Sequence, residues 1–463
     1  MLREHNTLID RSIFRAYDIR GVVGVGLTEQ MVYALGRAIG SMAIQQGEKR
    51  IAMGRDGRLS GPQLSRALSE GLLASGCDVL DVGVVPTPLL YYATHILDTR
   101  SGVMLTGSHN PAEYNGLKIV INGKTLAEEG IQELYDRVVN NRFAAGSGTR
   151  YEQNIIELYM TRVTSDIKLA RPLKIVVDCG NGVAGAVAPE LFRQMGCDVH
   201  ELFCEVDGNF PNHHPDPSQA ENLQDLIRAV RETGADIGLA FDGDGDRLGL
   251  VTASGEVIWP DRQLMVFAKE ILMRQPGAHI IYDVKCTNHL ARVIQEAGGI
   301  PVMWKTGHSL VKAKLAETGA ALAGEMSGHI FFKDRWYGFD DAVYSAARML
   351  EILASISGNS DALFADIPDS VNTPELKIYV DDHKKFSLME RLVKAANFSR
   401  AEVVTIDGLR VNFADGWGLV RPSNTTPCLV LRFEAESQKV LEKIQTLFRE
   451  FLLAEQADLV LPF

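Results

Sequence analysis

IGLAFDGDGDR, residues 237–247, joins a short apolar run to an acidic loop that is rich in glycine. The same kind of junction occurs twice more in the chain. One apolar run ends in the loop Thr106-Gly-Ser108-His-Asn-Pro111, and the other, at residues 320–323, passes into Gly324-Glu-Met-Ser-Gly-His329. Short apolar runs bounded by glycine and proline are typical of buried β-strands. Three strands that each end in a polar loop therefore form the framework of the fold.

Each of these loops is preceded by the same order of strand, helix and strand. Strands are predicted at residues 51–53 and 79–82, at 175–177 and 199–203, and at 280–282 and 300–304. Apolar residues at helical spacing separate the members of each pair, and in the first pair Ser60 is the predicted N-cap. This alternation predicts α/β units with mixed, largely parallel sheets covered by helices. In such folds ligands bind at the carboxyl ends of the strands, where the three loops lie.

The last hundred residues follow a different order. Strands are predicted at residues 376–380, 403–406, 409–413 and 429–433, with one helix near residues 388–396 and a closing helix that bears apolar residues from Val440 to Phe451. This is the pattern of an α+β domain. A chain of 463 residues exceeds the size at which a single core stops growing. We therefore expect four domains, at residues 1–153, 154–256, 257–368 and 369–463.

Composition argues against several classes of partner. Lys and Arg total 47 against 59 Asp and Glu, and the net charge of −12 would repel a nucleic-acid backbone and gives no support for binding to an anionic membrane. The amino terminus lacks the apolar core of a signal peptide, and no segment approaches the roughly 18 uninterrupted apolar residues of a membrane span. The cysteines are scattered without a C-x-x-C pair, which indicates reduced, mostly buried thiols. We expect a cytoplasmic protein that binds neither nucleic acid nor membrane.

The acidic loop is predicted to bind a divalent metal. The carboxylates of Asp242, Asp244 and Asp246 can converge on one hard cation, and the intervening glycines let the backbone curl around it. Magnesium is the expected ion. An EF-hand calcium loop is excluded, because Arg247 stands where that motif needs glycine and Ala253 stands where it needs glutamate. The alternative is a solvated Asp-Gly turn, in which the three carboxylates would repel one another.

Ser108 is predicted to be presented by its loop rather than packed in a core. In isolation the sequence Thr-Gly-Ser-His-Asn-Pro could equally be a structural turn. A serine hydroxyl is a weak nucleophile, but a phosphoserine beside a metal needs no such activation to give up its phosphoryl group. His109 could act as a base for the serine or could orient the loop or the phosphate. A nucleophile, a hard-metal site and a hydroxyl-binding loop together indicate phosphoryl transfer.

A fourth loop, Arg421-Pro-Ser423-Asn424-Thr425, lies between two strands of the last domain. Its guanidinium, hydroxyl and backbone N–H groups suit a phosphate group, and the alternative reading is a hairpin turn. Several other polar residues stand in or beside loops, where each taken alone is more often solvated than functional: Tyr17, Arg20, Arg55, Arg58, Lys118, Lys285 and His308.

The four loops, in this order, resemble the signature loops of the α-D-phosphohexomutases over essentially the whole chain. The resemblance implies four domains around a central active-site cleft, with a phosphoryl group on Ser108 and Mg²⁺ held by that group and by Asp242, Asp244 and Asp246. It implies that Glu325 and Ser327 bind sugar hydroxyls. The non-reacting phosphate would be clamped by Arg421, Ser423, Asn424 and Thr425. The other implied site residues are Tyr17, Arg20, His109, Lys118, Arg247, Lys285, His308 and His329, with Lys118 and His329 as candidates for proton transfer.

The same resemblance implies an activity. A phosphoryl group would move reversibly between positions 1 and 6 of mannose and glucose phosphates, through a bound hexose 1,6-bisphosphate that also acts as activator. Hexose phosphates are the expected partners, and we expect a monomer. One alternative is a phosphoglucosamine mutase, against which Met326 argues. A metal-dependent serine phosphatase would instead release inorganic phosphate, and a silent sugar-phosphate-binding protein would leave Ser108 and the three aspartates idle.

Overall fold

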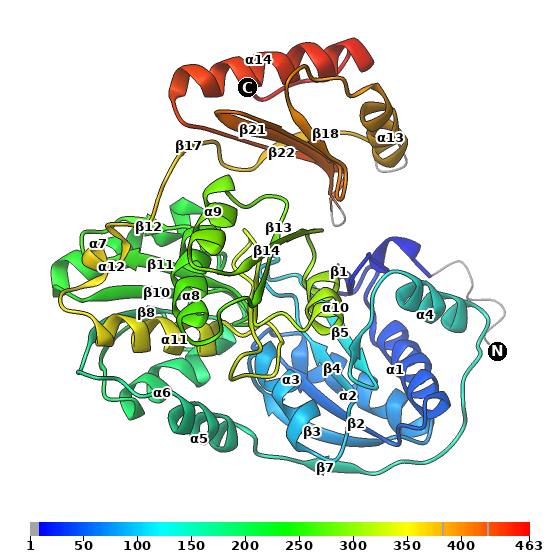
Figure 1. Ribbon diagram of the computed structural model, residues 1–463. Helices are drawn as coiled ribbons and strands as arrows, with labels where there is room; N and C mark the ends of the chain where they lie inside the picture. Colours follow the sequence, from blue (N-terminus) through cyan, green and yellow to red (C-terminus); the bar gives the residue numbers. More distant parts are fainter. Residues whose placement is uncertain (1–8, 382–383, 424–425) are drawn as a thin grey trace.

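Four β-sheets follow one another along the chain, each with its own helices (Figure 1). The computed structural model describes residues 9–381, 384–423 and 426–463. The first three sheets mix parallel and antiparallel strands, and the fourth is antiparallel. We call each sheet with its helices a unit. The predicted class of three α/β units followed by an α+β unit is confirmed.

The first sheet has the order β1-β5-β4-β2-β3-β7, and β6 pairs with β5. Its strands are β1 (Ile19–Val22), β2 (Arg50–Arg55), β3 (Asp78–Val84), β4 (Gly102–Leu105), β5 (Tyr114–Ile121), β6 (Lys124–Thr125) and β7 (Arg150–Glu152). Its helices are α1 (Glu29–Gln45), α2 (Gly61–Ala74), α3 (Thr87–Ile96) and α4 (Glu129–Val139). Helices α1, α2 and α4 share one apolar core with one face of the sheet, and α3 covers the other face.

The start of α2 differs from the prediction in one respect. Ser60 precedes the helix, but its side chain accepts no hydrogen bond from the first turn and its backbone is already helical. Its hydroxyl instead accepts a hydrogen bond from the Asn115 side chain at 2.9 Å. Ser60 is thus the N-cap residue, as predicted, but it makes no capping hydrogen bond, because Asn115 of β5 engages its hydroxyl.

The second and third sheets repeat this plan. The second, in the order β12-β11-β10-β8-β9, contains β8 (Lys174–Asp178), β9 (Asp198–Leu202), β10 (Ile237–Phe241), β11 (Leu248–Thr252) and β12 (Val257–Ile258), with helices α5 (Ile156–Asp166), α6 (Ala188–Gln194) and α7 (Gln224–Thr233). The third, in the order β14-β13-β15-β16, contains β13 (His279–Asp283), β14 (Ile300–Trp304), β15 (Leu322–Gly324) and β16 (Ile330–Phe332). Its region also holds α8 (Pro260–Arg274), α9 (Asn288–Glu296), α10 (His308–Thr318), α11 (Ala342–Ser355) and α12 (Ser360–Phe364).

The three predicted loops occupy equivalent places in these units. Each follows a strand that pairs in parallel on one side, namely β4, β10 or β15. Each then leads into an antiparallel partner, namely β5, β11 or β16. The loops are thus hairpin connections at the carboxyl ends of parallel strands, as the sequence predicted, and this position directs them to a common centre.

The fourth unit contains two strands that were not predicted from the sequence, β17 and β21. Its elements are β17 (Val371–Asn372), β18 (Leu376–Tyr379), β19 (Glu402–Val404), β20 (Leu409–Phe413), β21 (Gly416–Pro422), β22 (Cys428–Ala435), α13 (Lys385–Ala395) and α14 (Gln438–Glu455). β17 has only two residues, and the longer missed strand, β21, begins Gly-Trp-Gly, a sequence of low strand propensity. Gly418 is needed there because a Cβ would lie 2.5 Å from the Phe448 ring of α14. Arg421 therefore lies on a strand and not, as predicted, in a loop.

The fourth sheet is joined to the third unit by a buried arginine. The Arg410 guanidinium stacks on Trp417, 3.8 Å from the ring centroid, and donates hydrogen bonds to the carbonyl oxygens of Val284 and Cys286. Both carbonyls belong to the loop that follows β13. This contact sets the fourth unit beside the loops of the third (Figure 1).

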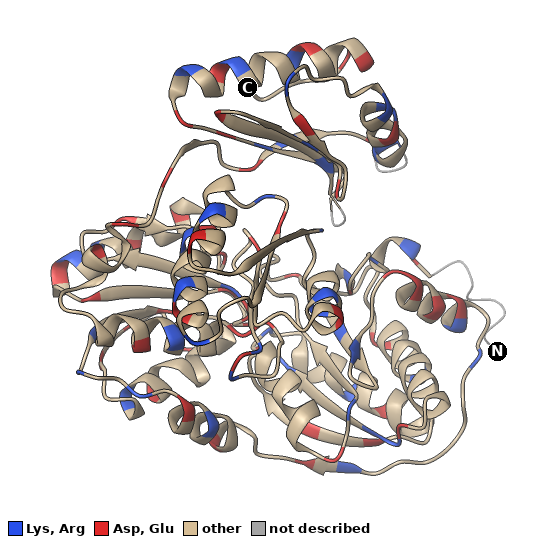
Figure 2. Cartoon of the chain, in the orientation of Figure 1, with Lys and Arg blue, Asp and Glu red and all other residues tan. Residues whose placement is uncertain are grey.

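Neither α8 nor α14 carries a long run of charged residues of one sign. Basic and acidic residues are interspersed along α8 and α14 (Figure 2). Among the described residues, no helix combines the length and apolar character that crossing a membrane requires. The six cysteines are buried and unbridged, as predicted.

We predict that Phe448→Ala destabilises the fourth unit. Phe448 is fully buried and packs edge-to-face on Phe433, with ring centroids 5.2 Å apart. Removal of a buried phenyl ring should lower the free energy of unfolding by about 3–5 kcal/mol. Urea unfolding followed by circular dichroism measures the loss. Val460, which is 85% exposed, is the control, and its change to alanine should cost no more than about 0.5 kcal/mol. Equal midpoints for the two variants would contradict the packing described here.

Candidate active site

Ser108 lies at the point where the first unit meets the second. Its hydroxyl donates a hydrogen bond to Asp242 Oδ2 at 3.0 Å and lies 3.1 Å from His109 Nδ1. The backbone of Ser108 is left-handed, with φ of 48°, a conformation that costs energy for a residue with a side chain. Burial and the Arg247 guanidinium hold the pKa of His109 well below its ordinary value. The serine therefore faces a carboxylate and a neutral imidazole.

Three aspartates of the second unit are completely buried beside Ser108. Asp242, Asp244 and Asp246 offer one oxygen each within 4.8 Å of one another. Burial, followed by repulsion from Asp246 and Asp244, raises the pKa of Asp242 well above its ordinary value. The loop approaches the serine closely, since a Cβ on Gly243 would lie 2.3 Å from the Ser108 carbonyl oxygen. The short distance explains the glycine between the aspartates.

Lys118 balances part of this negative charge. Its ammonium lies 2.7 Å from Asp244 Oδ2 and also contacts Asp246 Oδ2. Burial alone would lower the pKa of Lys118, but these two carboxylates raise it well above its ordinary value. Lys118 lies in the middle of β5, opposite Met104 of β4, and not in or beside a loop as we predicted. Its position in a strand of the first unit carries a positive charge into the second.

The three aspartates fit a divalent metal. All their donors are carboxylate oxygens, which are hard ligands suited to Mg²⁺ or Ca²⁺. Asp244 Oδ1 and Asp246 Oδ1 are buried, and neither has a hydrogen-bond partner among the described residues. Buried oxygens without donors are costly, so these two atoms suit a cation. The arrangement agrees with the predicted metal site and not with a solvated turn.

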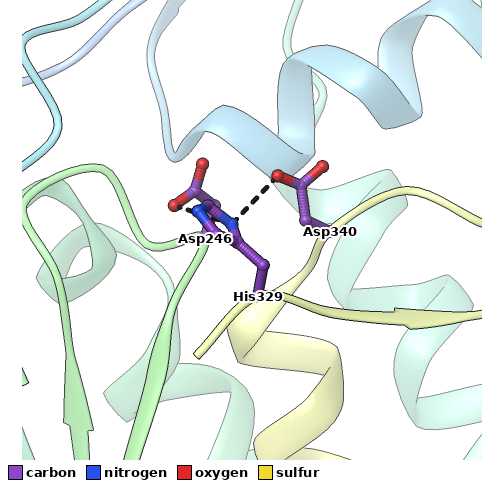
Figure 3. Close-up of side chains that lie close together, drawn as sticks. All are labelled: Asp246, His329 and Asp340. Carbon is purple, nitrogen blue, oxygen red and sulfur yellow. Dashed lines mark ion pairs between the residues drawn. The ribbon is translucent and has the colours of Figure 1, made fainter. Parts of the chain in front are cut away.

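His329 lies between two carboxylates (Figure 3). Its Nδ1 is 3.2 Å from Asp340 Oδ2 and 3.5 Å from Asp246 Oδ1, and its Nε2 accepts a hydrogen bond from Arg247 Nε at 3.1 Å. The His308 ring stacks on His329 with centroids 5.5 Å apart. Two predicted histidines and the predicted arginine thus meet beside the metal-binding aspartates.

A cleft of about 620 Å³ opens above these groups and takes residues from all four units. The predicted residues that line it are Tyr17, Arg20, His109, Arg247, Lys285, His308, Glu325, Ser327, His329, Arg421 and Ser423. Ser108, Lys118, Asp242, Asp244 and Asp246 are buried next to this lining and do not form part of it. Asn424 and Thr425 lie outside the described residues.

Polar contacts hold the third and fourth units across the cleft. Lys285 Nζ of the third unit donates to Glu375 Oε1 of the fourth at 2.6 Å. Within the fourth unit, Arg421 Nε donates to Asp407 Oδ2 at 2.9 Å. Asp407 Oδ2 also accepts a hydrogen bond from the backbone N–H of Thr306 at 3.0 Å. Burial opposes a raised pKa for Arg421, but Asp407 raises it, so the guanidinium remains a cation. Lys285 and Arg421 are therefore cations of the cleft wall, each held in place by a carboxylate.

Some site residues were not found from the sequence. Thr87 donates to Asp244 Oδ2 at 2.5 Å, Asp340 contacts His329, and Glu375 and Arg432 line the cleft. Arg432 lies in the middle of β22, and Glu375 stands just before β18. Arg432, inside a strand, has no glycine or proline beside it. The other three did carry signals that the sequence analysis did not use: Thr87 stands between Pro86 and Pro88, Glu375 follows Pro374, and Asp340 belongs to an adjacent acidic pair in an apolar surrounding.

Comparison with known proteins assigns the family. Four consecutive domains described as phosphoglucomutase/phosphomannomutase match the chain: alpha/beta/alpha domain I at residues 11–145, domain II at 150–255, domain III at 259–370 and the C-terminal domain at 375–451. A phosphomannomutase/phosphoglucomutase of Pseudomonas putida is 58% identical over 98% of both chains. A phosphoglucomutase of Neisseria gonorrhoeae is 54% identical over 95% of this chain and 96% of its own.

A solved structure agrees with these relatives. The crystal structure of a phosphoglucomutase/phosphomannomutase family protein from Burkholderia thailandensis covers 98% of this chain and 100% of its own, with 55% identity and a TM-score of 0.95. The protein defined by this fold and site is thus a phosphohexomutase. The chain belongs to the phosphoglucomutase/phosphomannomutase family, and the predicted class of enzyme is confirmed.

We predict that Mg²⁺ stabilises the native chain through the three aspartates. Binding to the folded state alone adds about 2.7 kcal/mol when the free ion is at 100 times its Kd. The melting temperature should therefore rise with MgCl₂, while NaCl of equal ionic strength should leave it unchanged. Asp246→Ala should abolish the rise.

Asp178→Asn is the matched control for that measurement. Asp178 is a buried aspartate of the same unit that pairs with His213 and lies outside the cluster. This variant should keep the response to MgCl₂. A rise that persists in Asp246→Ala would place the ion elsewhere.

Proposed function

We propose that the enzyme moves a phosphoryl group reversibly between positions 1 and 6 of mannose and glucose phosphates, with Ser108 as the carrier. The observation that supports this most directly is the position of the Ser108 hydroxyl, 3.0 Å from Asp242, beside a cleft with separate polar walls. The P. putida relative is named for both sugars and the N. gonorrhoeae relative for glucose alone. The bisphosphate formed midway would turn within the cleft and return its other phosphate to Ser108.

The chain's own residues would hold Mg²⁺ at Asp242, Asp244 and Asp246, together with phosphorylated Ser108. The bound ion would supply positive charge to the oxygens of the transferring group, as in other phosphoryl transfers. Arg247 and Arg20 would add fixed positive charge from the protein. Preorganised charge of this kind supplies most of the stabilisation of a phosphoryl-transfer transition state.

The substrate would be held at both ends. Glu325 and Ser327 would bind sugar hydroxyls, with Glu325 fixed by a hydrogen bond of 2.5 Å from the backbone N–H of Gly307. The non-reacting phosphate would be bound by Arg421 and Ser423, and by the predicted Asn424 and Thr425. Tyr17, Lys285 and His308 would complete the walls. A clamp of this kind must accept two orientations of one ligand, and arginine and hydroxyl donors meet that need.

Proton transfer is proposed for His329 and Lys118. His329 Nε2 carries a lone pair that Arg247 now engages, and it could receive the proton of the attacking sugar hydroxyl. Lys118 is held protonated by Asp244 and Asp246 and could return a proton to the leaving oxygen. His109 would orient Ser108 and its phosphate.

Several expectations about the enzyme stay predictions. They are activation by a hexose 1,6-bisphosphate, a cytoplasmic location, a monomeric state and the lack of nucleic-acid and membrane partners. The alternatives of a phosphoglucosamine mutase and of a serine phosphatase are not favoured, because the relatives above share more than half of their residues with this chain and carry mutase names.

We predict mutase activity on both sugars. Purified protein with Mg²⁺, a trace of glucose 1,6-bisphosphate and either glucose 1-phosphate or mannose 1-phosphate should give the 6-phosphate, which ³¹P NMR follows directly. Inorganic phosphate should not accumulate, because the phosphoryl group passes between Ser108 and sugar. Release of inorganic phosphate as the main product would make the enzyme a phosphatase.

We also predict that Ser108→Ala separates catalysis from binding. The variant lacks the carrier oxygen, so activity should fall by at least about 1000-fold, the scale on which loss of a covalent nucleophile acts. The residues proposed to hold the sugar and phosphate are untouched, so calorimetric binding of glucose 1-phosphate should persist. Glu325→Gln is the comparison variant, and it should weaken binding. Loss of binding in Ser108→Ala would give the serine a structural role.

A further inference from the structure

Arg58 is a buried cation beneath the Ser108 loop and has no role in the chemistry proposed above. The residue is 1% exposed and does not line the cleft. Its five guanidinium N–H groups all have acceptors. The Nε donates to Asp56 Oδ2, and the four remaining N–H groups donate to the backbone carbonyl oxygens of Ser108, Asn110, Pro111 and Tyr114, at 2.5 to 2.9 Å.

The Asp56 carboxylate, which pairs with Arg58, also binds the Ser108 loop directly. Its Oδ2 accepts hydrogen bonds from the Thr106 hydroxyl at 2.8 Å and from the backbone N–H of Gly107 at 3.1 Å. The Thr106 hydroxyl in turn accepts the backbone N–H of Ser108 at 2.8 Å. The pair Asp56 and Arg58 therefore fixes backbone donors and acceptors on both sides of Ser108.

Two features show that the loop is built around the guanidinium. A Cβ on Gly107 would lie 2.4 Å from Arg58 Cζ, so only glycine lets the guanidinium pass this close to the backbone. Ser108 is held at a φ of 48°, which a loop of this composition would not keep without outside constraint. Hydrogen bonds on each side of the strained residue supply that constraint.

The same guanidinium is also packed against the second unit. The Phe210 ring centroid lies 5.2 Å from Arg58 Cζ. The Ser108 carbonyl oxygen that Arg58 engages is the atom that approaches Gly243 of the metal-binding loop. Arg58 thus sets the distance between the serine and the aspartates.

We infer that Arg58, with Asp56 and Thr106, positions Ser108 for phosphoryl transfer by fixing the backbone of its loop. The inference rests on the proposed role of Ser108 as carrier. Its consequence is specific to the chemical step, because the residues proposed to hold the substrate lie on other units, apart from Tyr17, which does not contact Arg58 through any hydrogen bond described above. Displacement of a reacting atom by about 1 Å can cost about 100-fold in rate.

The test compares kcat and KM for four variants. Arg58→Met removes the donors, and Thr106→Val removes the hydroxyl with little change of shape, whereas Thr106→Ser keeps it. Arg348→Met is the matched control, because Arg348 is also fully buried but pairs with Asp334 and Glu270 away from the cleft lining. Melting temperatures are recorded for all four.

We expect Arg58→Met and Thr106→Val to lower kcat by about 100-fold while KM stays within about threefold, since only the chemical step is affected. Thr106→Ser should restore kcat, and Arg348→Met should lower the melting temperature without this loss. Intact mass after incubation with glucose 1,6-bisphosphate should show slower phosphorylation of Arg58→Met and Thr106→Val. If Arg58→Met does not fold, the difference in kcat between Thr106→Val and Thr106→Ser tests the inference.

Wild-type kcat in both Arg58→Met and Thr106→Val would overturn the inference, as would an equal loss in Arg348→Met. Failure of the proposed function looks different. In that case the wild-type chain itself would lack mutase activity or would not be phosphorylated on Ser108, whatever the variants do.

Discussion

Three buried carboxylates in one short loop are the constraint on which the cleft depends. Asp242, Asp244 and Asp246 repel one another where water cannot screen them, and a buried charge is costly unless it is paired. Lys118 comes from a strand of the first unit to pair with two of them. The ion pairs of Lys118 with these aspartates therefore hold the first unit against the second, and with it Ser108.

The repeated topology explains why the remaining groups arrive at the same place. In each α/β unit the polar loop is the hairpin between a parallel strand and its antiparallel neighbour. The carboxyl ends of the three parallel strands then face one cleft. The fourth unit adds a different element, the end of β21 with Arg421, and Arg410 seats it on the loop that carries Lys285. Rigid placement of charge from four directions is what a phosphoryl-transfer site requires.

Much of this arrangement could be predicted, because loops that bear chemistry are marked by glycine, proline and short polar residues after apolar strands. Ser108 and the acidic loop were found in that way. Residues inside strands carry no such mark, so Lys118 was expected in or beside a loop and Arg432 was not expected in the site at all. The strand β21 was missed because its glycines serve the packing of α14. Contacts between distant segments, such as Lys118 with Asp244, have no signature in a single sequence. The domain boundaries near residues 153, 256 and 368 stay predictions.

In the proposed mechanism a phosphoryl group on Ser108 shares one metal ion with Asp242, Asp244 and Asp246. ³¹P NMR of the phosphorylated enzyme, titrated with Mn²⁺ in place of Mg²⁺, tests this directly, because a paramagnetic ion broadens the signal of a phosphate that it binds. We expect the phosphoserine signal to disappear at one equivalent of Mn²⁺ and to stay sharp in the Asp246→Ala variant. A signal that remains sharp in the wild-type protein with Mn²⁺ bound would contradict it.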